Sequence, residues 1–260
     1  MGRIHLGTSG FSYADWRPLL YPEGLAQGAW LQRYAEVFTT VELNATFYRL
    51  PTEKAVERWR DQTPGSFLFS CKGSQYLTHR RRLLETGAGI DRYFAPLRLL
   101  GPKLGPVLWQ LPPQWKKPDL ERLEDFLRHL PQEVQHVFEF RAEGWYDEEV
   151  LDLLDRYGAA VCEHDLLENP PPRLSGDIRY LRFHGDAYGG RYGREALVDV
   201  ANDLASSDRE SFVYFNNDRG GAAVLDALDL SELLDELVPD EPTVASRLEE
   251  AEMSHESQRS

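Results

Sequence analysis

Short apolar segments alternate with amphipathic ones along nearly the whole chain, and this alternation most restricts the folds open to it. Eight segments have the composition of strands: 3–8, 40–44, 67–72, 106–111, 136–141, 159–164, 179–184 and 211–216. Helical patterns follow at 29–38, 53–62, 90–100, 119–130, 147–157, 194–204 and 220–237. Strands that alternate with helices are typical of parallel α/β folds, in which each helix returns the chain to the start of the next strand.

Eight such units favour a closed barrel over an open sheet. They occupy most of the 260 residues, and a (β/α)8 barrel needs about 250. The segment after the sixth strand contains Pro170, Pro171 and Pro172, so we expect the helix there to be short or missing. No linker rich in proline or glycine divides the chain. We therefore predict one α/β domain, a single (β/α)8 TIM-type barrel over residues 1–238, followed by an acidic, flexible tail at 239–260.

The charge balance restricts the partners. The net charge is −14, and residues 231–260 hold nine acidic and two basic residues, which is typical of a solvated tail. This acidity argues against a groove that grips extended duplex nucleic acid by its phosphates. The chain has no apolar run of the roughly 20 residues that a membrane helix needs, so we expect no membrane partner. The N-terminus lacks the apolar core of a signal peptide, which predicts a cytoplasmic location.

Two cysteines, Cys71 and Cys162, are widely separated and lie in apolar segments. This is neither a disulfide framework nor a metal-binding spacing, so we interpret both as packing residues on the helix-facing side of their strands.

Polar side chains recur at alternate positions of six strands, near the strands' carboxyl ends. Alternate strand residues in a barrel point inward. The polar inward set is Glu42, Asn44, Ser70, Lys72, Gln110, Glu139, Arg141, Arg182, His184, Tyr214 and Asn216. Barrel enzymes build active sites at this end, whereas a purely structural barrel fills its interior with branched aliphatic residues.

A structural alternative is an internal ion-pair network, because a buried charge needs a partner. Glu42 would then pair with Lys72, and Glu139 with Arg141. If Asp165 is counted with the two glutamates, the predicted pocket is neutral as long as its histidine is uncharged.

Two glycine-containing segments, 185–190 and 217–221, follow the seventh and eighth strands. In many barrels these loops bind phosphate through backbone N–H groups, although such glycines also make simple tight turns.

Aromatic residues gather in the first two loops, where they could stack on a ligand or pack as a lid on the rim. They are Tyr13, Trp16, Tyr21, Phe47 and Tyr48. His79 precedes Arg80–Arg82 and is either an acid/base or anion contact or part of a solvated basic run.

Ordered motifs along the chain resemble those of the YecE-like "domain of unknown function 72" family. They are GTSGFSYADW at 7–16, TVELNATFY at 40–48, LGPVLWQLPP at 104–113, EFR at 139–141, RFHG at 182–185 and YFNND at 214–218. The resemblance covers about residues 3–237 and implies one (β/α)8 barrel but no named reaction. The chain departs from the family pattern at Phe11, where Trp is usual, at 142–144, where His-x-Ser is usual before Trp145, and at Asp226, where Asn is common.

These observations favour an enzyme that acts on a small polar or phosphorylated molecule by metal-independent acid/base chemistry, as a hydrolase, lyase or isomerase. The candidate catalytic residues are Glu42, Glu139, His184 and Lys72. The candidate substrate-binding residues are Trp16, Asn44, Tyr48, His79, Gln110, Arg141, Asp165, Arg182, Asn216 and Asn217.

We expect no cofactor and no metal, because the lysine and arginines of this set would repel a divalent cation. Glycoside hydrolysis of the common barrel type is disfavoured, since Gln110 and Arg182 stand where carboxylates are needed. The alternative function is a non-catalytic module that binds a nucleotide, a nucleic-acid end or a protein. The sequence predicts no oligomeric state.

Overall fold

The computed structural model describes residues 2–169, 171–185, 190–238, 244, 246–248 and 251. The chain divides into two compact units, each with its own internal contacts. The first unit comprises Met1–Val41, Gln62–Phe67 and Phe183–Ser260, and the second unit comprises Glu42–Asp61 and Leu68–Arg182. The chain passes between them inside strands β2 (Thr40–Leu43) and β7 (Ile178–Phe183), so these boundaries do not fall at linkers. The single domain over residues 1–238 stays a prediction.

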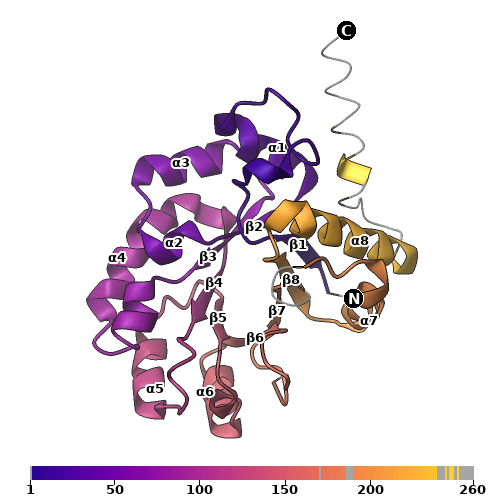
Figure 1. Ribbon diagram of the computed structural model, residues 1–260. Helices are drawn as coiled ribbons and strands as arrows, with labels where there is room; N and C mark the ends of the chain where they lie inside the picture. The colour runs from indigo at the N-terminus through magenta and orange to yellow at the C-terminus, as the bar shows by residue number, and fades with distance from the viewer. Residues whose placement is uncertain are drawn as a thin grey trace. The chain divides into compact units, whose positions relative to one another are not determined.

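The strands of the described chain form one eight-stranded sheet in the order β1-β8-β7-β6-β5-β4-β3-β2. Every strand pair with a described register is parallel. From β2 to β8 each strand lies beside its sequence neighbour, and β1 lies beside β8, which is the order of a (β/α)8 barrel. The predicted fold class is confirmed (Figure 1).

The second unit contains the central run of strands and their helices. The strands are β3 (Leu68–Lys72), β4 (Leu104–Gln110), β5 (His136–Glu139) and β6 (Ala160–His164). The helices are α2 (Ala45–Tyr48), α3 (Glu53–Asp61), α4 (Gly87–Leu97), α5 (Leu120–His129) and α6 (Glu148–Arg156).

Side-chain caps fix where two of these helices begin. The Asp119 carboxylate accepts from the backbone N–H of Arg122 at 3.1 Å at the start of α5. Asp147 accepts from Glu149 N at 2.9 Å at the start of α6. Such caps satisfy backbone donors that a first helical turn otherwise leaves unpaired.

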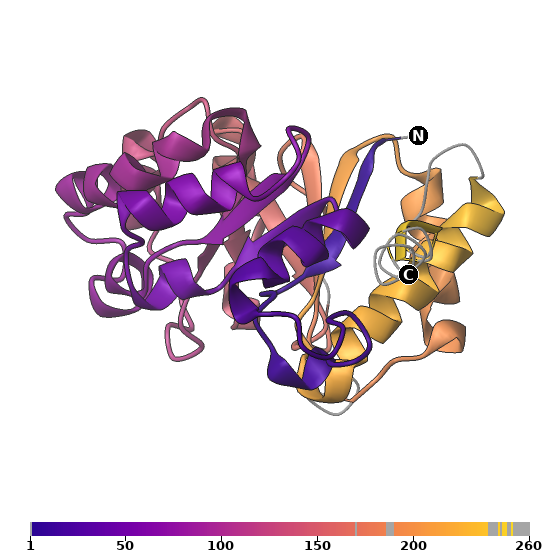
Figure 2. The same cartoon turned by 90° about the horizontal axis from the view of Figure 1, so that it is seen from above.

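The first unit pairs β1 (Ile4–Thr8) with β8 (Glu210–Phe215), from Ile4 opposite Ser211 to Thr8 opposite Phe215. Its helices are α1 (Trp30–Val37), α7 (Arg194–Ser206) and α8 (Ala222–Leu237). The last two pack against each other beside the N-terminal strand (Figure 2).

Several elements differ from the predicted bounds by one or two residues. β2 ends at Leu43 and β5 ends at Glu139, so Asn44 and Arg141 lie just beyond their strands. No helix joins β6 to β7 in the described residues 165–169 and 171–177, as the prolines predicted. The predicted flexible tail at 239–260 falls mostly outside the described residues. Where the chain is described there, Val244 is buried and its N–H donates to Ser231 Oγ at 2.8 Å.

Candidate functional site

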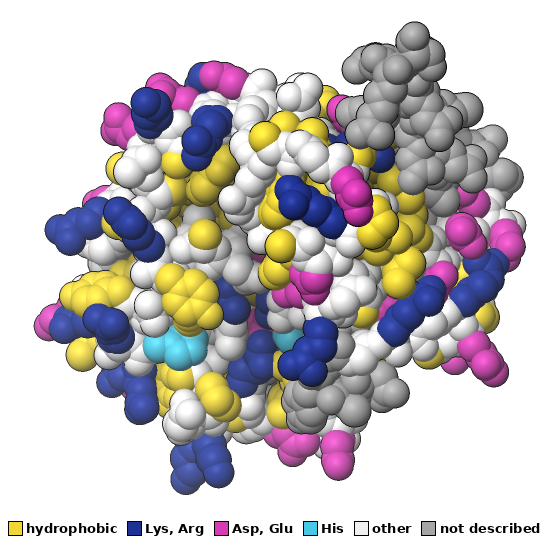
Figure 3. All heavy atoms as spheres, turned by 45° about the horizontal axis from the view of Figure 1, so that its top comes forward, with side chains coloured by type: hydrophobic (Ala, Val, Ile, Leu, Met, Phe, Trp, Pro, Cys, Tyr) yellow, Lys and Arg dark blue, Asp and Glu magenta, His cyan; other side chains and the backbone are white. Residues whose placement is uncertain are grey.

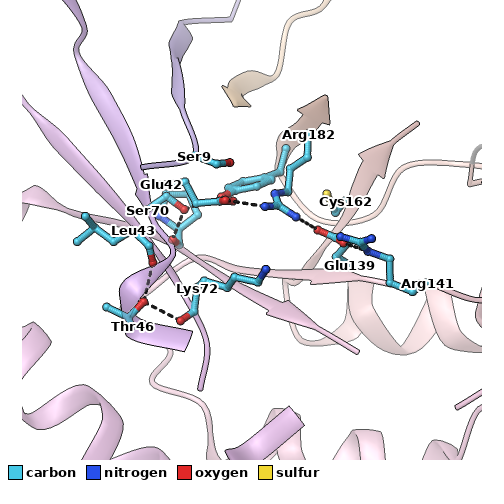
Figure 4. A network of polar contacts seen from close by, with 12 residues as sticks. Ser9, Glu42, Leu43, Thr46, Ser70, Lys72, Glu139, Arg141, Cys162 and Arg182 are labelled. Atoms are coloured by element: carbon cyan, nitrogen blue, oxygen red, sulfur yellow. Dashed lines mark hydrogen bonds and ion pairs between the residues drawn. The ribbon is translucent and has the colours of Figure 1, made fainter. Parts of the chain in front are cut away.

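Buried ion pairs run in a line through the second unit, from Glu42 to Arg182, Glu139 and Arg141 (Figure 4). Arg182 Nη2 lies 2.8 Å from Glu42 Oε1, and Arg182 Nη1 lies 2.5 Å from Glu139 Oε2. Arg141 Nε donates to Glu139 Oε1. The side chains of Glu42, Glu139 and Arg182 are fully buried, whereas that of Arg141 is 20% exposed. We call these four residues the ion-pair line.

Three strands supply the buried members of the ion-pair line. Glu42 lies on β2, Glu139 ends β5, and Arg182 lies on β7. The second oxygen of Glu42 is also satisfied, because Tyr180 OH donates to Glu42 Oε2 at 2.6 Å. Ser70 Oγ lies 2.7 Å from Tyr180 OH and fixes that hydroxyl in turn. The carboxylates are therefore bound on several sides by fixed donors.

The charges of the ion-pair line keep its members ionised. Burial alone raises the pKa of Glu139, but Arg182 and Arg141 outweigh it and hold that pKa well below its ordinary value. Burial lowers the pKa of Arg182, yet Glu139 and Glu42 hold it well above its ordinary value. A carboxylate held so firmly in its charged form is a poor general acid near neutral pH.

Lys72 ends β3 beside the ion-pair line but takes no part in it. Of the two ion pairs named for the structural alternative, that of Glu139 with Arg141 is present, and that of Glu42 with Lys72 is wrong, since Glu42 pairs with Arg182. Among the described residues no carboxylate lies within ion-pair distance of Lys72, and its Nζ instead lies 4.8 Å from the centroid of the Phe47 ring. Its pKa is lowered to about 8 by burial and by the nearby charge of Arg182.

His79 lies on a π-helical turn, Tyr76–Arg80, that follows β3. Its Nδ1 is 2.9 Å from Thr78 Oγ1, and its ring meets the Phe47 ring edge-on at 5.0 Å. The pKa of His79 is lowered by burial and by the charge of Lys72. Single π-turns occur often at functional sites because they re-aim a side chain. We call Lys72, His79, Phe47 and the exposed Tyr48 the Lys72 cluster.

His164 and Cys162 also face the ion-pair line, and the sequence analysis missed both. The Cys162 thiol lies beside Glu139, so its predicted helix-facing position is wrong (Figure 4). His164 is two residues further along β6. Its Nδ1 accepts from Leu166 N at 3.2 Å and its Nε2 donates to Phe140 O at 2.7 Å, an arrangement that suits the neutral ring. The alternation of strand residues was the signal that would have found them.

The other candidates of the second unit lie around these groups. Asn44 precedes α2, and its buried Oδ1 has no hydrogen-bond partner in the described chain. Gln110 ends β4 and is half-buried, and Tyr48 is 71% exposed. Asp165 is exposed in the turn after β6. Without Asp165 the site holds two carboxylates and three cations, so its net charge is +1 when Lys72 is protonated and not zero as expected. The charged groups counted are Glu42, Glu139, Lys72, Arg141 and Arg182.

The remaining candidates belong to the first unit. Trp16 is fully buried, stacks on Tyr21 and Tyr34, and donates from Nε1 to Asp218 O at 3.3 Å. This favours the packing interpretation for Trp16 over ligand stacking.

Asn217 is buried and donates from Nδ2 to Asp226 Oδ2 at 2.7 Å, and Asn216 is half-buried just beyond β8. His184 is buried just after β7. The expected phosphate loop at 185–190 falls mainly on residues 186–189, which lie outside those described.

The described residues contain no group of three His, Cys, Asp or Glu side chains that could hold a metal ion. None of their helices has the length and apolar character that crossing a bilayer requires. Lysine and arginine side chains lie near histidine rings on the face shown in Figure 3, although the net charge is −14.

The fold and the site together define a (β/α)8 barrel protein with charged residues at the carboxyl ends of its strands. A family model described as "Protein of unknown function DUF72" matches residues 5–248, so the chain belongs to the DUF72 family. The resemblance seen in the sequence is confirmed.

Similar proteins include UPF0759 protein YunF of Bacillus subtilis, 29% identical over 89% of this chain and 95% of that protein. UPF0759 protein YecE of Escherichia coli is 31% identical over 53% of this chain and 48% of its own length. A solved DUF72 family structure from Thermotoga maritima is 28% identical, has a TM-score of 0.77, and covers 90% of this chain and 99% of its own. A second, from Enterococcus faecalis, is 20% identical with a TM-score of 0.75 over 89% and 95%, and shows the fold alone.

Proposed function

We propose that the protein is an enzyme that binds a small anionic molecule between Lys72 and Arg141 and acts on it by metal-independent acid/base chemistry. The observation that carries this proposal is the charge balance of the site. Three cations stand against two carboxylates, and Arg182 is enclosed between both carboxylates. Lys72 has no carboxylate within ion-pair distance in the described chain, and Arg141, which pairs with Glu139, is partly exposed.

An anion at this position would interact with the charges of Lys72 and Arg141 and lie close to Asn44. It would balance the surplus positive charge, and charge-assisted hydrogen bonds to such groups are about twice as strong as neutral ones. The buried Oδ1 of Asn44 offers an acceptor for a ligand hydroxyl or amide. The ligand class is therefore a polar molecule with a phosphate or carboxylate and at least one hydrogen-bond donor.

In this proposal Lys72 and His79, and not Glu42 and Glu139, transfer protons. Glu139 is fixed in its ionised form by two arginines, which makes it part of the framework. Lys72, with a pKa of about 8, exchanges its proton in the range where acid/base catalysis is efficient. His79 contacts the same Phe47 ring and is the second group suited to carry a proton.

A binding screen tests this function. Wild type, Lys72→Met and Arg141→Gln are titrated calorimetrically with small phosphorylated and carboxylated metabolites and their neutral analogues. Arg92→Gln, at an exposed position of α4, is the matched control. Loss of one charged contact should weaken anion binding by roughly tenfold or more, while the control binds like wild type.

Two results would oppose the proposal. Anions that bind all four proteins equally would place the site elsewhere, and a preference for neutral analogues would remove the charge argument. Tight binding with no conversion of any ligand would instead favour the non-catalytic binding module.

A further inference from the structure

We propose that Lys72 is a covalent catalytic residue, whose Nζ forms an imine with a carbonyl ligand that carries a carboxylate or a phosphate. This inference rests on the proposed function and narrows it to carbonyl substrates. It follows from the contacts of Lys72 compared with those of the other four lysines.

Lys72 is the lysine whose amine is both partly buried and free of a hydrogen-bond acceptor among the described residues. Lys54, Lys116 and Lys117 are exposed. Lys103 is buried, but its Nζ donates to Arg60 O at 2.6 Å, which occupies the amine. The Lys72 amine instead faces the Phe47 ring. When the amine is deprotonated, this ring does not hydrogen-bond to the nitrogen lone pair, so the lone pair stays available to react.

The backbone beneath Lys72 is held so that the amine is aimed at the ion-pair line (Figure 4). Lys72 O accepts from Tyr93 OH at 3.1 Å and lies 2.7 Å from Thr46 Oγ1. The next residue must be small, because a Cβ on Gly73 would lie 2.2 Å from a ring atom of Trp109. Covalent catalysis depends on a nucleophile held in a fixed orientation, because it has to approach the carbonyl carbon in a near-attack geometry.

Burial of the Lys72 amine favours its neutral, nucleophilic form. Arg182 on β7 and, more weakly, Arg141 after β5 act in the same direction on its pKa, while Glu139 and Glu42 oppose them, and the net effect is a lowered pKa. A lysine becomes a nucleophile in this way, by desolvation beside other cations. The partly exposed Arg141 can also bind the ligand's anionic group, which would hold its carbonyl in the same space.

The reaction needs no oxidant or reductant. The Nζ lone pair attacks the carbonyl carbon, the C–N bond forms, and the carbonyl electron pair moves to oxygen, which takes up a proton. The nitrogen loses one proton to give the neutral carbinolamine. The hydroxyl group then takes up a second proton and leaves as water, while the nitrogen loses its remaining proton and the C=N bond forms. His79, beside the same Phe47 ring, is placed to supply the proton on which the departing water depends.

Reductive trapping tests the proposal. The full-length protein is treated at pH 7 with glyoxylate, glycolaldehyde phosphate or neutral glycolaldehyde, together with sodium cyanoborohydride, and the modified lysine is identified by peptide mass mapping. At pH 7 the neutral fraction of an amine of pKa about 8 exceeds that of an ordinary lysine by roughly 300-fold. Because a less basic amine is also less nucleophilic, we expect Lys72 to be labelled on the order of tenfold faster than the exposed lysines.

Two variants separate the imine from simple anion binding. Lys72→Arg keeps the positive charge but has no reactive amine, so it should retain binding of inorganic phosphate, at an affinity measured beside that of wild type, and give no adduct at position 72. Lys103→Arg removes the other buried lysine and should be labelled like wild type.

Faster labelling by either anionic aldehyde than by glycolaldehyde would support the proposal, and the better of the two would distinguish carboxylate from phosphate substrates. Labelling of Lys72 no faster than that of Lys54, Lys116 and Lys117 would overturn it. Phosphate binding without a Lys72 adduct would also overturn it but would leave the proposed function standing.

Discussion

Replacing Lys72 by methionine should make the folded protein more stable near neutral pH. Methionine is an unbranched side chain only one atom shorter than lysine, and it carries no charge. In the folded state the pKa of Lys72 is lowered from 10.5 to about 8, so its ammonium form is destabilised by its surroundings. Removal of that charge relieves the protein of an unfavourable interaction.

The magnitude follows from the size of the pKa shift. A difference of 2.5 pH units between 10.5 and 8 corresponds to about 3 kcal/mol at 1.36 kcal/mol per unit, which is an upper limit. Loss of the cation–π contact with Phe47 opposes this by about 0.5–1 kcal/mol. We therefore expect Lys72→Met to raise the free energy of unfolding by about 2 kcal/mol at pH 7.

The effect has a defined pH dependence. Between pH 8 and 10.5 the unfolded chain holds a proton on Lys72 that the folded chain has lost, so the wild type gains stability as the pH rises through this range. Below pH 8 the full cost of the charge is present. The advantage of the variant should therefore shrink by about 2 kcal/mol between pH 7 and pH 10.

Urea unfolding of wild type, Lys72→Met and Lys54→Met at both pH values measures this difference. The exposed Lys54 serves as control, and its replacement should change stability by no more than about 0.5 kcal/mol at either pH. A Lys72→Met protein that is less stable than wild type at pH 7, or whose advantage is the same at pH 10, would refute the reasoning.

Three further substitutions probe the framework, each by urea unfolding at pH 7. Arg182→Met should cost about 3–5 kcal/mol because it leaves Glu42 and Glu139 buried without their shared partner, and a loss below 1 kcal/mol would mean that water replaces the guanidinium. Trp16→Ala should cost about 3–5 kcal/mol through the cavity it leaves, and a near-neutral result would argue that Trp16 is not a packing residue. Asp226→Asn should cost about 1–3 kcal/mol, because in the wild type both carboxylate oxygens accept hydrogen bonds from backbone or side-chain donors, and the amide keeps only one of these oxygens. Unchanged stability would show that an amide can replace the carboxylate.

The site could be predicted from the sequence as far as strand alternation extends. Glu42, Lys72, Glu139 and Arg182 were placed together because inward positions near the carboxyl ends of barrel strands converge. The same alternation also places Tyr180 two residues before Arg182 on β7, and Tyr180 was missed because an aromatic residue suggests packing rather than a polar contact.

The pairing of the charges could not be predicted in the same way. Alternation gives the face of a side chain but not the distance between faces, so Glu42 was assigned to Lys72 on the adjacent strand. In the structure the longer reach of Arg182 spans from Glu42 to Glu139 and leaves Lys72 out. The sequence also did not predict which aromatic residues of the first two loops are exposed. Trp16 is fully buried, whereas Tyr48 is 71% exposed.

That difference in pairing decides which residues can do chemistry. A group that transfers protons or attacks a carbonyl has to change its charge near neutral pH, and the ion-pair line prevents Glu139 from doing so. Burial acts in the opposite sense on Lys72, because it disfavours the ammonium ion, and the charge of Arg182 adds to that effect. The buried carboxylates thus hold Arg182 and Arg141 in place, and Arg182 in turn helps burial to lower the pKa of Lys72. On this argument the glutamates contribute to catalysis by positioning the arginines, and the residue that the network leaves unpaired is the one that reacts.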